Sequence, residues 1–417
     1  MNTDRQIHRR IEELKGDIAA FIRRLIEVPT VNPPGEHYDE CARIIGEKLT
    51  ELDISWQRID VPQGRLPELA PKGRGLPRPS VLGLIGEGEQ EVHFHGHYDV
   101  VPASSPDQFR PVVSEGKLSG RGAADMKGGL AVILYMLQVL KESGVRLGGR
   151  VSFSFTPDEE TGGLAGLKYL LDEGFINRSV IGVIDPEPSS GDIINGSRGA
   201  LSFEVTIGGR ASHVMTEHLG VNAFEKMVNV VGAFQGLKRR IEQRRTRYRI
   251  RPPGRRQSVL LLGGTFGGGT NFNIVPDRAW FSVDRRFNPE ERLGDVRAEI
   301  DEIVSALKAE GIEIEISVFQ EGEASLTAEN HPLCRTLSRC VEQVKGQRPS
   351  VSICPGLLET RFCVERGIPA VIYGPGLVEE AHGPHEYVRL EEVSACVEIF
   401  ALAAIDLLGS SVTLRSC

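Results

Sequence analysis

Five short motifs in the chain each set a carboxylate or an imidazole among glycines or prolines. They are GHYDVVP with His97, GRGAADMKGG with Asp125, PDEETGG with Glu159 and Glu160, DPEPSSG with Glu187, and AHGPHE with His382. Imidazole and carboxylate groups are ligands that zinc and its neighbours accept in proteins. Roughly five or six such groups, one of them bridging, make a two-metal site. The set therefore predicts a two-metal hydrolase.

The first motif follows a predicted strand and carries two polar groups on one side. His97 and Asp99 are two residues apart, and side chains alternate along a strand. A carboxylate beside a ligating imidazole orients the ring and raises its basicity, so Asp99 is predicted to support His97. His93 and His95 share the face of His97. We expect these two histidines to be core residues or to contact the ligand residue without binding metal themselves.

Two carboxylate-rich motifs offer both ligands and a base. Glu159 and Glu160 follow the predicted strand RVSFSF, where a solvated pair of carboxylates is the simplest structural explanation. If one binds metal, the other can act as general base on a metal-activated water, whose pKa such an ion lowers to about 7. Glu187 stands between two prolines, and Asp185 is an alternative ligand from the same motif.

The remaining two motifs lie in glycine-rich segments. Asp125 precedes a helical stretch, where an aspartate commonly caps the helix, but the tight glycine context and the companion motifs favour a ligand. His382 follows the apolar run AVIYGPG, and His385 is near enough to bind as well. We favour His382 alone.

The elements that must position these motifs alternate between strands and helices. The expected strands are VLGLIG from Val81, EVHFHGHYD from Glu91, RVSFSFTPD from Arg150 and VIGVID from Val180, with a helix from Lys127 between the second and third. Such alternation predicts an α/β sheet with helices on both faces. Ligands bind beyond the carboxyl ends of the strands in such sheets, which is where the motifs fall. The segment 62–79 is rich in proline and glycine and is predicted to be a loop.

From Leu201 the pattern changes. The expected order is a strand LSFEVTI, a helix over 221–242, strands SVLLLGGT and RAWFSVDRR, a helix over 290–308 and a strand IEIEISVF. This β-α-β-β-α-β order is that of the ferredoxin-like unit. We therefore expect an inserted domain at 201–320, within a discontinuous catalytic domain made of 1–200 and 321–417.

Composition limits the possible classes of protein. The 417 residues, 40% hydrophobic and 25% charged, are typical of a globular protein with two domains. A net charge of -8 does not favour nucleic acid or an anionic membrane as partner. The seven cysteines form no CxxC pair, and the N-terminal stretch lacks the apolar core of a signal peptide, so we expect a reduced, cytoplasmic chain. The basic stretch 238–256 fits a solvated helix end and loop, with polyanion binding as the alternative.

Taken together, the five motifs resemble those of the zinc-dependent deacylase and exopeptidase family, which includes acetylornithine deacetylase, succinyl-diaminopimelate desuccinylase, aminoacylase and glutamate carboxypeptidases. The resemblance covers nearly the whole chain, the inserted domain included. It implies a zinc-exopeptidase-like mixed sheet flanked by helices. It also implies that the inserted domain is a lid through which two copies form a homodimer.

The resemblance further implies how the ligands are shared between two divalent ions. Asp125 would bridge the ions. One ion would also be held by His97 and Glu187, and the other by Glu160 and His382.

Other roles also follow from the resemblance. Glu159 would be the general base and Asp99 the residue that orients the ligating imidazole. In the lid, GRASHVMTEHLGVNA resembles the segment whose histidine reaches the active site of the partner subunit, which makes His213 an oxyanion stabiliser. Asn273 and Arg286 match positions that touch substrate, and an arginine there suits a substrate carboxylate.

Two departures from the family pattern concern the substrate. The usual Gly-Thr-Asp or Gly-Ser-Asp step is replaced by PGLLETR, in which Leu358 and Glu359 follow Gly356. Glu217 stands where the lid segment usually has proline. The first change lies where the family builds its substrate pocket, so Gly356 is expected beside substrate. An apolar wall from Leu357 and Leu358 would favour a larger or aromatic substrate.

The sequence thus predicts a metal-dependent hydrolase of an amide bond in a small N-acyl amino acid or related carboxylate. A metallo-carboxypeptidase or dipeptidase is one alternative, and an aminohydrolase acting on an unusual, aromatic amino acid is another. A catalytically silent binding protein on the same scaffold is the alternative from a different class. The ligand types suit zinc, cobalt and manganese alike.

Overall fold

The computed structural model describes residues 2–412, and these residues form two compact units. Unit 1 takes in the residues up to 195, 327–352 and those from 362 onward, and unit 2 takes in 196–326 and 353–361. Among the described residues no cysteine forms a disulfide. Cys417 lies outside the described part of the chain.

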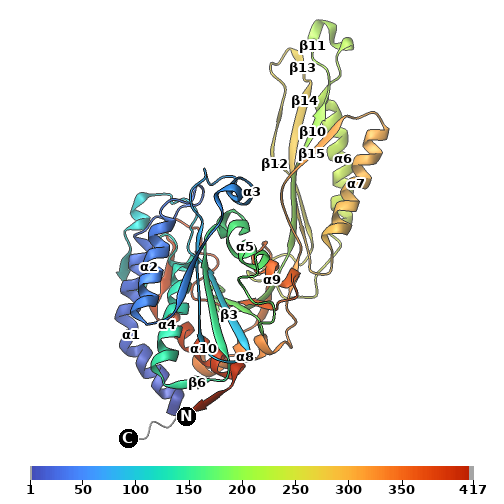
Figure 1. Ribbon diagram of the computed structural model, residues 1–417. Helices are drawn as coiled ribbons and strands as arrows, with labels where there is room; N and C mark the ends of the chain where they lie inside the picture. Colours follow the sequence, from blue (N-terminus) through green and yellow to red (C-terminus); the bar gives the residue numbers. More distant parts are fainter. Residues whose placement is uncertain (1, 413–417) are drawn as a thin grey trace. The chain divides into compact units, whose positions relative to one another are not determined.

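A mixed sheet is the centre of unit 1 (Figure 1). Its strands, in spatial order, are β1 (Trp56–Asp60), β2 (Pro79–Gly86), β7 (Arg150–Thr156), β3 (Glu91–His97), β8 (Val183–Asp185), β18 (Ala370–Ile372) and β9 (Ile193–Ser197). Strands β7, β3, β8 and β18 run parallel, whereas β1, β2 and β9 pair antiparallel with their neighbours. β17 (Val351–Cys354) also pairs with β9, and the last residues of β9 pair within unit 2 with β16 (Ser325–Leu326).

Helices cover both faces of this sheet. Neighbouring residues of a strand point to opposite sides, and apolar side chains on both sides of the sheet pack against helices. Val81 of β2 belongs to one apolar core and Leu82 to the other. The larger core contains the long helices, and Phe94 of β3 meets Phe400 there with ring centroids 5.2 Å apart. These helices are α1 (Asn2–Ile26), α2 (Tyr38–Glu51), α4 (Gly128–Glu142), α8 (Pro332–Lys345) and α10 (Leu390–Leu408). The smaller core contains α3 (Leu66–Leu69), α5 (Tyr169–Asp172) and residues of α9 (Arg361–Glu365).

One helical stretch within residues 2–412, Ala123–Glu142, is long and apolar enough to cross a membrane by length and composition alone. Of its most apolar window, 94% is buried inside the fold. It contains α4, which packs against α1 and α10. A core helix explains this composition.

Two small sheets complete unit 1. One joins β4 (Val112–Ser114), β5 (Lys117–Ser119) and β19 (Tyr387–Arg389), and the other joins β6 (Val145–Leu147) and β20 (Ser410–Val412). In the first, Tyr387 is opposite Ser119. This pairing brings the chain that follows His382 next to the chain that precedes Asp125.

Unit 2 is built on a four-stranded antiparallel sheet with two helices (Figure 1). The strand order is β12 (Val259–Gly268), β14 (Arg278–Phe287), β10 (Gly199–Gly208) and β15 (Ile314–Gly322), and the helices are α6 (Ala223–Ile241) and α7 (Leu293–Ala309). Along the chain these elements run β-α-β-β-α-β. Alternate residues of β14, among them Phe281 and Val283, join α6 and α7 in one apolar core. A two-stranded ribbon, β11 (Ser212–His213) with β13 (Ile274–Val275), adjoins the sheet.

The predicted α/β sheet with helices on both faces is confirmed, and most predicted elements match the structure within a few residues. The predicted loop over 62–79 is wrong in part. A 3₁₀ turn at Gln63–Arg65 and the helix α3 interrupt it. Pro67 stands in the first turn of α3, where a proline removes no intrahelical hydrogen bond, so the proline that indicated a loop is compatible with the helix.

Candidate metal centre

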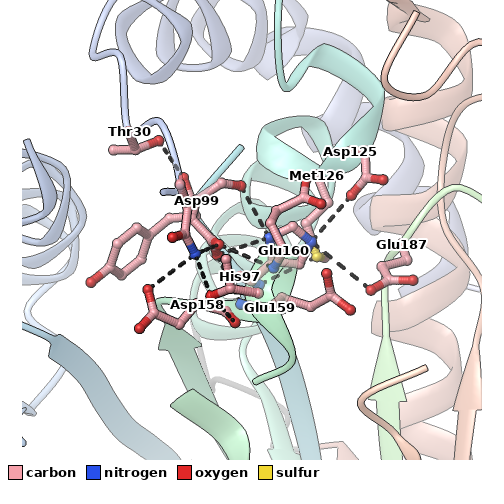
Figure 2. A network of polar contacts seen from close by, with 12 residues as sticks. Thr30, His97, Asp99, Asp125, Met126, Asp158, Glu159, Glu160 and Glu187 are labelled. Atoms are coloured by element: carbon pink, nitrogen blue, oxygen red, sulfur yellow. Dashed lines mark hydrogen bonds and ion pairs between the residues drawn. The ribbon is translucent and has the colours of Figure 1, made fainter. Parts of the chain in front are cut away.

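The four parallel strands end at one edge of the sheet, and the predicted ligands lie there. His97 is the last residue of β3, Glu159 and Glu160 begin the turn after β7, and Glu187 follows β8 by two residues. His382 comes from the loop after β18. Figure 2 shows the side chains of the strand-end residues converging with Asp125.

One ligand cluster at this edge of the sheet consists of His97, Glu159 and Glu187. Each offers one nitrogen or oxygen atom, and these atoms all lie within 4.8 Å of one another. The His97 side chain is fully buried, and its Nδ1 lies 3.1 Å from the carbonyl oxygen of Asp99 and 3.3 Å from Oδ1 of the same residue. The ring is thereby oriented so that Nε2 points to Glu187, whose Oε1 is 3.9 Å away. We call this set the inner triad.

The second cluster, the outer triad, consists of Asp125, Glu160 and His382, again with donor atoms within 4.8 Å of one another. Nε2 of His382 lies 3.1 Å from Oδ2 of Asp125 and 3.2 Å from Oε1 of Glu160. In contrast to His97, the His382 side chain is 48% exposed.

Asp125 faces both imidazoles at once. Its Oδ1 lies 3.1 Å from Nε2 of His97, and its Oδ2 lies 3.1 Å from Nε2 of His382. One carboxylate with an oxygen toward each of two ligand groups is the arrangement by which a carboxylate bridges two ions. The Asp125 side chain does not cap α4, whose N-terminus has no side-chain cap.

The carboxylates of the centre are crowded and largely removed from water. Burial, together with the charges of Asp185 and Glu159, raises the pKa of Glu187 well above its usual range. Burial also raises the pKa of Glu160, to about 7. For Asp125, burial is outweighed by hydrogen bonds with His382 and His97, so its pKa is lowered. Divalent cations would offset this repulsion, and the imidazole and carboxylate donors are of the types they bind.

A buried network that the sequence did not predict holds the Glu159–Glu160 turn. The backbone amides of these two residues donate to Asp99, at 3.2 Å to Oδ1 and 3.1 Å to Oδ2. Nδ2 of Asn32 donates to Asp99 Oδ2 at 2.8 Å and to Asp158 Oδ1 at 3.1 Å. Asp99 therefore positions both the ring of His97 and the neighbouring turn. Asn32 follows an N-terminal helix, and no spacing in the sequence relates it to the motifs.

The other polar groups of the motifs lie outside the two triads. His93 Nδ1 lies 2.9 Å from Ser152 Oγ, and Ser154 Oγ lies 2.8 Å from both His93 Nε2 and His95 Nδ1. Burial and the neighbouring His95 lower the pKa of His93 to about 3, so it is a neutral core residue. Asp185 is not a member of either triad, and His385 is exposed and belongs to neither.

The predicted residues of unit 2 fall into three places. Nε2 of His213, on β11, lies 3.3 Å from Nδ2 of Asn273. Arg286 is at the far end of β14 from that ribbon, where its Nε donates to Asp284 Oδ1 at 3.0 Å. Arg286 comes eight residues after Arg278 along the strand, about 27 Å at ~3.4 Å per residue. Gly356 lies in the 353–361 segment, and its amide donates to Cys354 Sγ at 3.3 Å.

Comparisons with known proteins agree with this architecture. Residues 93–406 match the family described as Peptidase family M20/M25/M40. A probable succinyl-diaminopimelate desuccinylase of Staphylococcus epidermidis is 25% identical over 403 residues, covering 91% of this chain and 95% of that protein. An N-formyl-4-amino-5-aminomethyl-2-methylpyrimidine deformylase of Bacillus subtilis is 26% identical over 421 residues, covering 94% and 95%.

Two solved structures show the same fold. The dipeptidase Dug1p of Saccharomyces cerevisiae superimposes with a TM-score of 0.74 at 16% identity, over 98% of this chain and 99% of that one. The YXEP protein of Bacillus subtilis, described as a dinuclear metal binding peptidase, superimposes with a TM-score of 0.69 at 18% identity, over 96% and 100%.

Proposed function

The chain belongs to the peptidase family M20/M25/M40, and we propose that it hydrolyses an amide bond in a small N-acyl amino acid or a related carboxylate with the help of divalent metal ions. Membership in this family makes the protein a hydrolase of carbon–nitrogen bonds. The observation that supports the finer proposal is that the two triads are adjacent. Asp125, a member of the outer triad, also contacts His97 of the inner triad.

The chain's own residues fit two divalent ions. His97 and Glu187 would hold one, Glu160 and His382 the other, with Asp125 between them. Such ions, when bound, supply Lewis acidity that polarises a carbonyl and eases the ionisation of a water. Zinc, cobalt and manganese all accept these donors.

Glu159 is the proposed general base. Its carboxylate is half-buried at the inner triad, and its backbone amide is held by Asp99, so the side chain starts from a fixed backbone position. In the proposed reaction it takes a proton from the attacking water and later delivers one to the leaving nitrogen. Asp99 keeps the ring of His97 in place through Nδ1 during these steps.

The lid proposal concerns His213, Asn273 and Arg286. We propose that His213 stabilises the oxyanion in the partner subunit's site and that Arg286 and Asn273 contact substrate, with Gly356 beside the pocket. A homodimer through unit 2 is part of the same proposal. It is supported by exposed apolar side chains on this unit, which a dimer would cover: Phe224, Val228, Leu261, Phe266 and Phe272.

The deciding experiment measures metal content and hydrolysis in the same preparation. Purified protein is analysed for bound metal and assayed on N-acetyl and N-succinyl amino acids, dipeptides and aromatic amino acids, with Glu159→Gln as control. Release of free amine from an N-acyl substrate, lost in the control while metal is retained, supports the proposal. Cleavage of dipeptides alone identifies a peptidase, and ammonia from an aromatic amino acid identifies an aminohydrolase. Bound metal without activity on any substrate would favour a silent binding protein.

Co-expression tests the lid. A mixed dimer of His213→Ala and Glu159→Gln subunits should regain activity in one of its two sites, because each subunit supplies what the other lacks. Activity no higher than that of the separate variants, or a monomeric wild-type protein in analytical ultracentrifugation, would overturn this part of the proposal.

A further inference from the structure

A buried ion pair lies beside the outer triad. Nη1 of Arg121 is 2.6 Å from Oε2 of Glu386, and the two side chains are 2% and 0% exposed. Arg121 precedes Asp125 by four residues, and Glu386 follows His382 by four. Two charges removed from water to this extent are costly unless hydrogen bonds compensate them. Within the described part of the chain Nε of Arg121 has no hydrogen-bond partner, but other polar atoms of the pair bond to the loops that supply Asp125 and His382.

Glu386 fixes the backbone that carries Asp125. Its Oε1 accepts hydrogen bonds from the backbone amides of Ala124 and Asp125, both at 3.0 Å. Asp125 has non-helical dihedral angles, φ -119° and ψ 94°, so its amide lies outside the regular hydrogen bonding of α4. The Glu386 carboxylate therefore satisfies backbone donors that the turn leaves without helical acceptors.

Arg121 fixes the loop that carries His382. Its Nη2 donates to the carbonyl oxygen of His382 at 3.1 Å and to that of Pro102 at 3.4 Å. His382 has φ 63°, a left-handed conformation that residues other than glycine adopt only when their surroundings hold them there. The carbonyl held by Arg121 is that of this strained residue.

The small sheet of β4, β5 and β19 keeps the two loops in register. The backbone amide of Gly120 donates to the carbonyl oxygen of Glu386 at 3.0 Å, and β5 and β19 continue the pairing beyond it. In contrast, the turn that carries Glu159 and Glu160 is held by Asp99 and Asn32, which come from other segments.

We propose that Arg121 and Glu386 form one positioning pair that sets the spacing of Asp125 and His382, and so controls binding of the ion at the outer triad. The inference rests on the proposed function, because it assumes that both triads hold metal. Neither residue touches the reacting atoms. Their effect passes through the backbone of two ligands and leaves the backbone of Glu187 and Glu160 untouched.

Cobalt(II) titration of the metal-free full-length chain tests the pair, followed by visible absorption and by calorimetry. Wild-type protein should bind two equivalents. In Glu386→Gln and in Arg121→Lys one equivalent should bind about 10–100-fold more weakly, the usual effect of altering a group that supports a ligand. The other equivalent, which shares only Asp125 and keeps His97 and Glu187, should be weakened less. Excess metal should restore turnover in both variants, with little change in KM.

Glu91→Gln is the matched control. Glu91 is itself buried and forms an ion pair with the partly exposed Arg150, 2.9 Å away, at the opposite end of β3 from His97. This variant should keep both cobalt affinities even if it unfolds at a lower temperature. If Glu386→Gln fails to fold, the test rests on Arg121→Lys. This substitution keeps the positive charge and loses only the planar set of guanidinium donors.

Each result decides the matter. Equal weakening of both equivalents in the variants, or no weakening of either, overturns the positioning pair. Wild-type protein that binds no cobalt overturns the proposed function itself. Two equivalents bound by wild-type and variants alike leaves the proposed function intact and refutes only the role of Arg121 and Glu386.

Discussion

The two triads of unit 1 offer similar ligand atoms but are built differently. In the inner triad, His97 ends a buried strand, and its ring is fully enclosed. In the outer triad, His382 stands in a loop, adopts a left-handed backbone and is 48% exposed. Pairing with Thr156 of β7 and the contacts of its ring with Asp99 fix His97 before any ligand is considered. His382 depends on contacts that hold its loop. The inner triad is therefore the rigid half of the metal centre, and the outer triad is the half that depends on supporting contacts.

This difference predicts that the two ions leave the protein in a fixed order, and metal removal is expected to have the largest effect. An ion present at a thousandfold excess over its dissociation constant stabilises the folded chain by about 4 kcal/mol, so two ions together stabilise it by about 8. A weak chelator should take the ion from the exposed outer triad first, with a first loss of stability, and a strong chelator should then take the second. Metal analysis after each step, combined with chemical denaturation, checks the order. Simultaneous release of both would remove the proposed contrast.

Glu159 probes the inner triad, where it is a third candidate donor. If it acts as the general base, Glu159→Gln should lower kcat by about 10²–10⁴-fold and leave two equivalents of metal bound. Loss of one equivalent would instead make Glu159 a ligand of the inner triad. Steady-state kinetics and metal content of the same sample separate these outcomes.

The sequence predicts most of the ligand residues of the two triads, but it does not predict the residues that hold these ligands in place. The motif residues stand where runs of strand pattern end, and parallel strands bring such positions to one edge, so His97 and Glu187 could be predicted together. Arg121 and Glu386 lie inside two of the quoted motifs, yet nothing in their spacing distinguishes them from solvated charges. Their pairing depends on β19 lying beside β5, strands of three residues each with no sequence signal of their own. Asn32 and Arg78 were missed for the same reason, because their partners are distant in the chain.

Arg78 shows how strongly the rigid half depends on burial. Its Nε donates to Asp158 Oδ2 next to the Glu159–Glu160 turn, and both side chains are nearly inaccessible to water. Burial and the charge of Asp99 already raise the pKa of Asp158 to about 6. Removing one partner of such a pair leaves an uncompensated buried charge, so Arg78→Ala should lower the free energy of unfolding by about 3–5 kcal/mol.

The matched control is Arg110→Ala, which removes the exposed pair of Arg110 with Asp107. That change should alter stability by about 0–1 kcal/mol. Urea denaturation of the two variants gives the comparison, and similar losses in both would contradict the distinction between enclosed and exposed charges.

Substitution of His93 is expected to have the smallest effect. It tests the burial of β3 independently of the metal ligands. It shares a face of β3 with His97, but its ring lies between two serine hydroxyls, and burial lowers its pKa to about 3. The unfolded chain takes up a proton on this residue below about pH 6.5, and the folded chain does so only near pH 3. The stability that His93 contributes is therefore complete above pH 6.5 and falls as the pH drops, by about 2 kcal/mol at pH 5. His93→Gln keeps a hydrogen-bonding side chain without this proton, so its unfolding free energy should fall less steeply between pH 6.5 and pH 5. Parallel slopes in the two proteins would show that the ring is not held neutral, and the solvent-free interior assigned to β3 would be wrong.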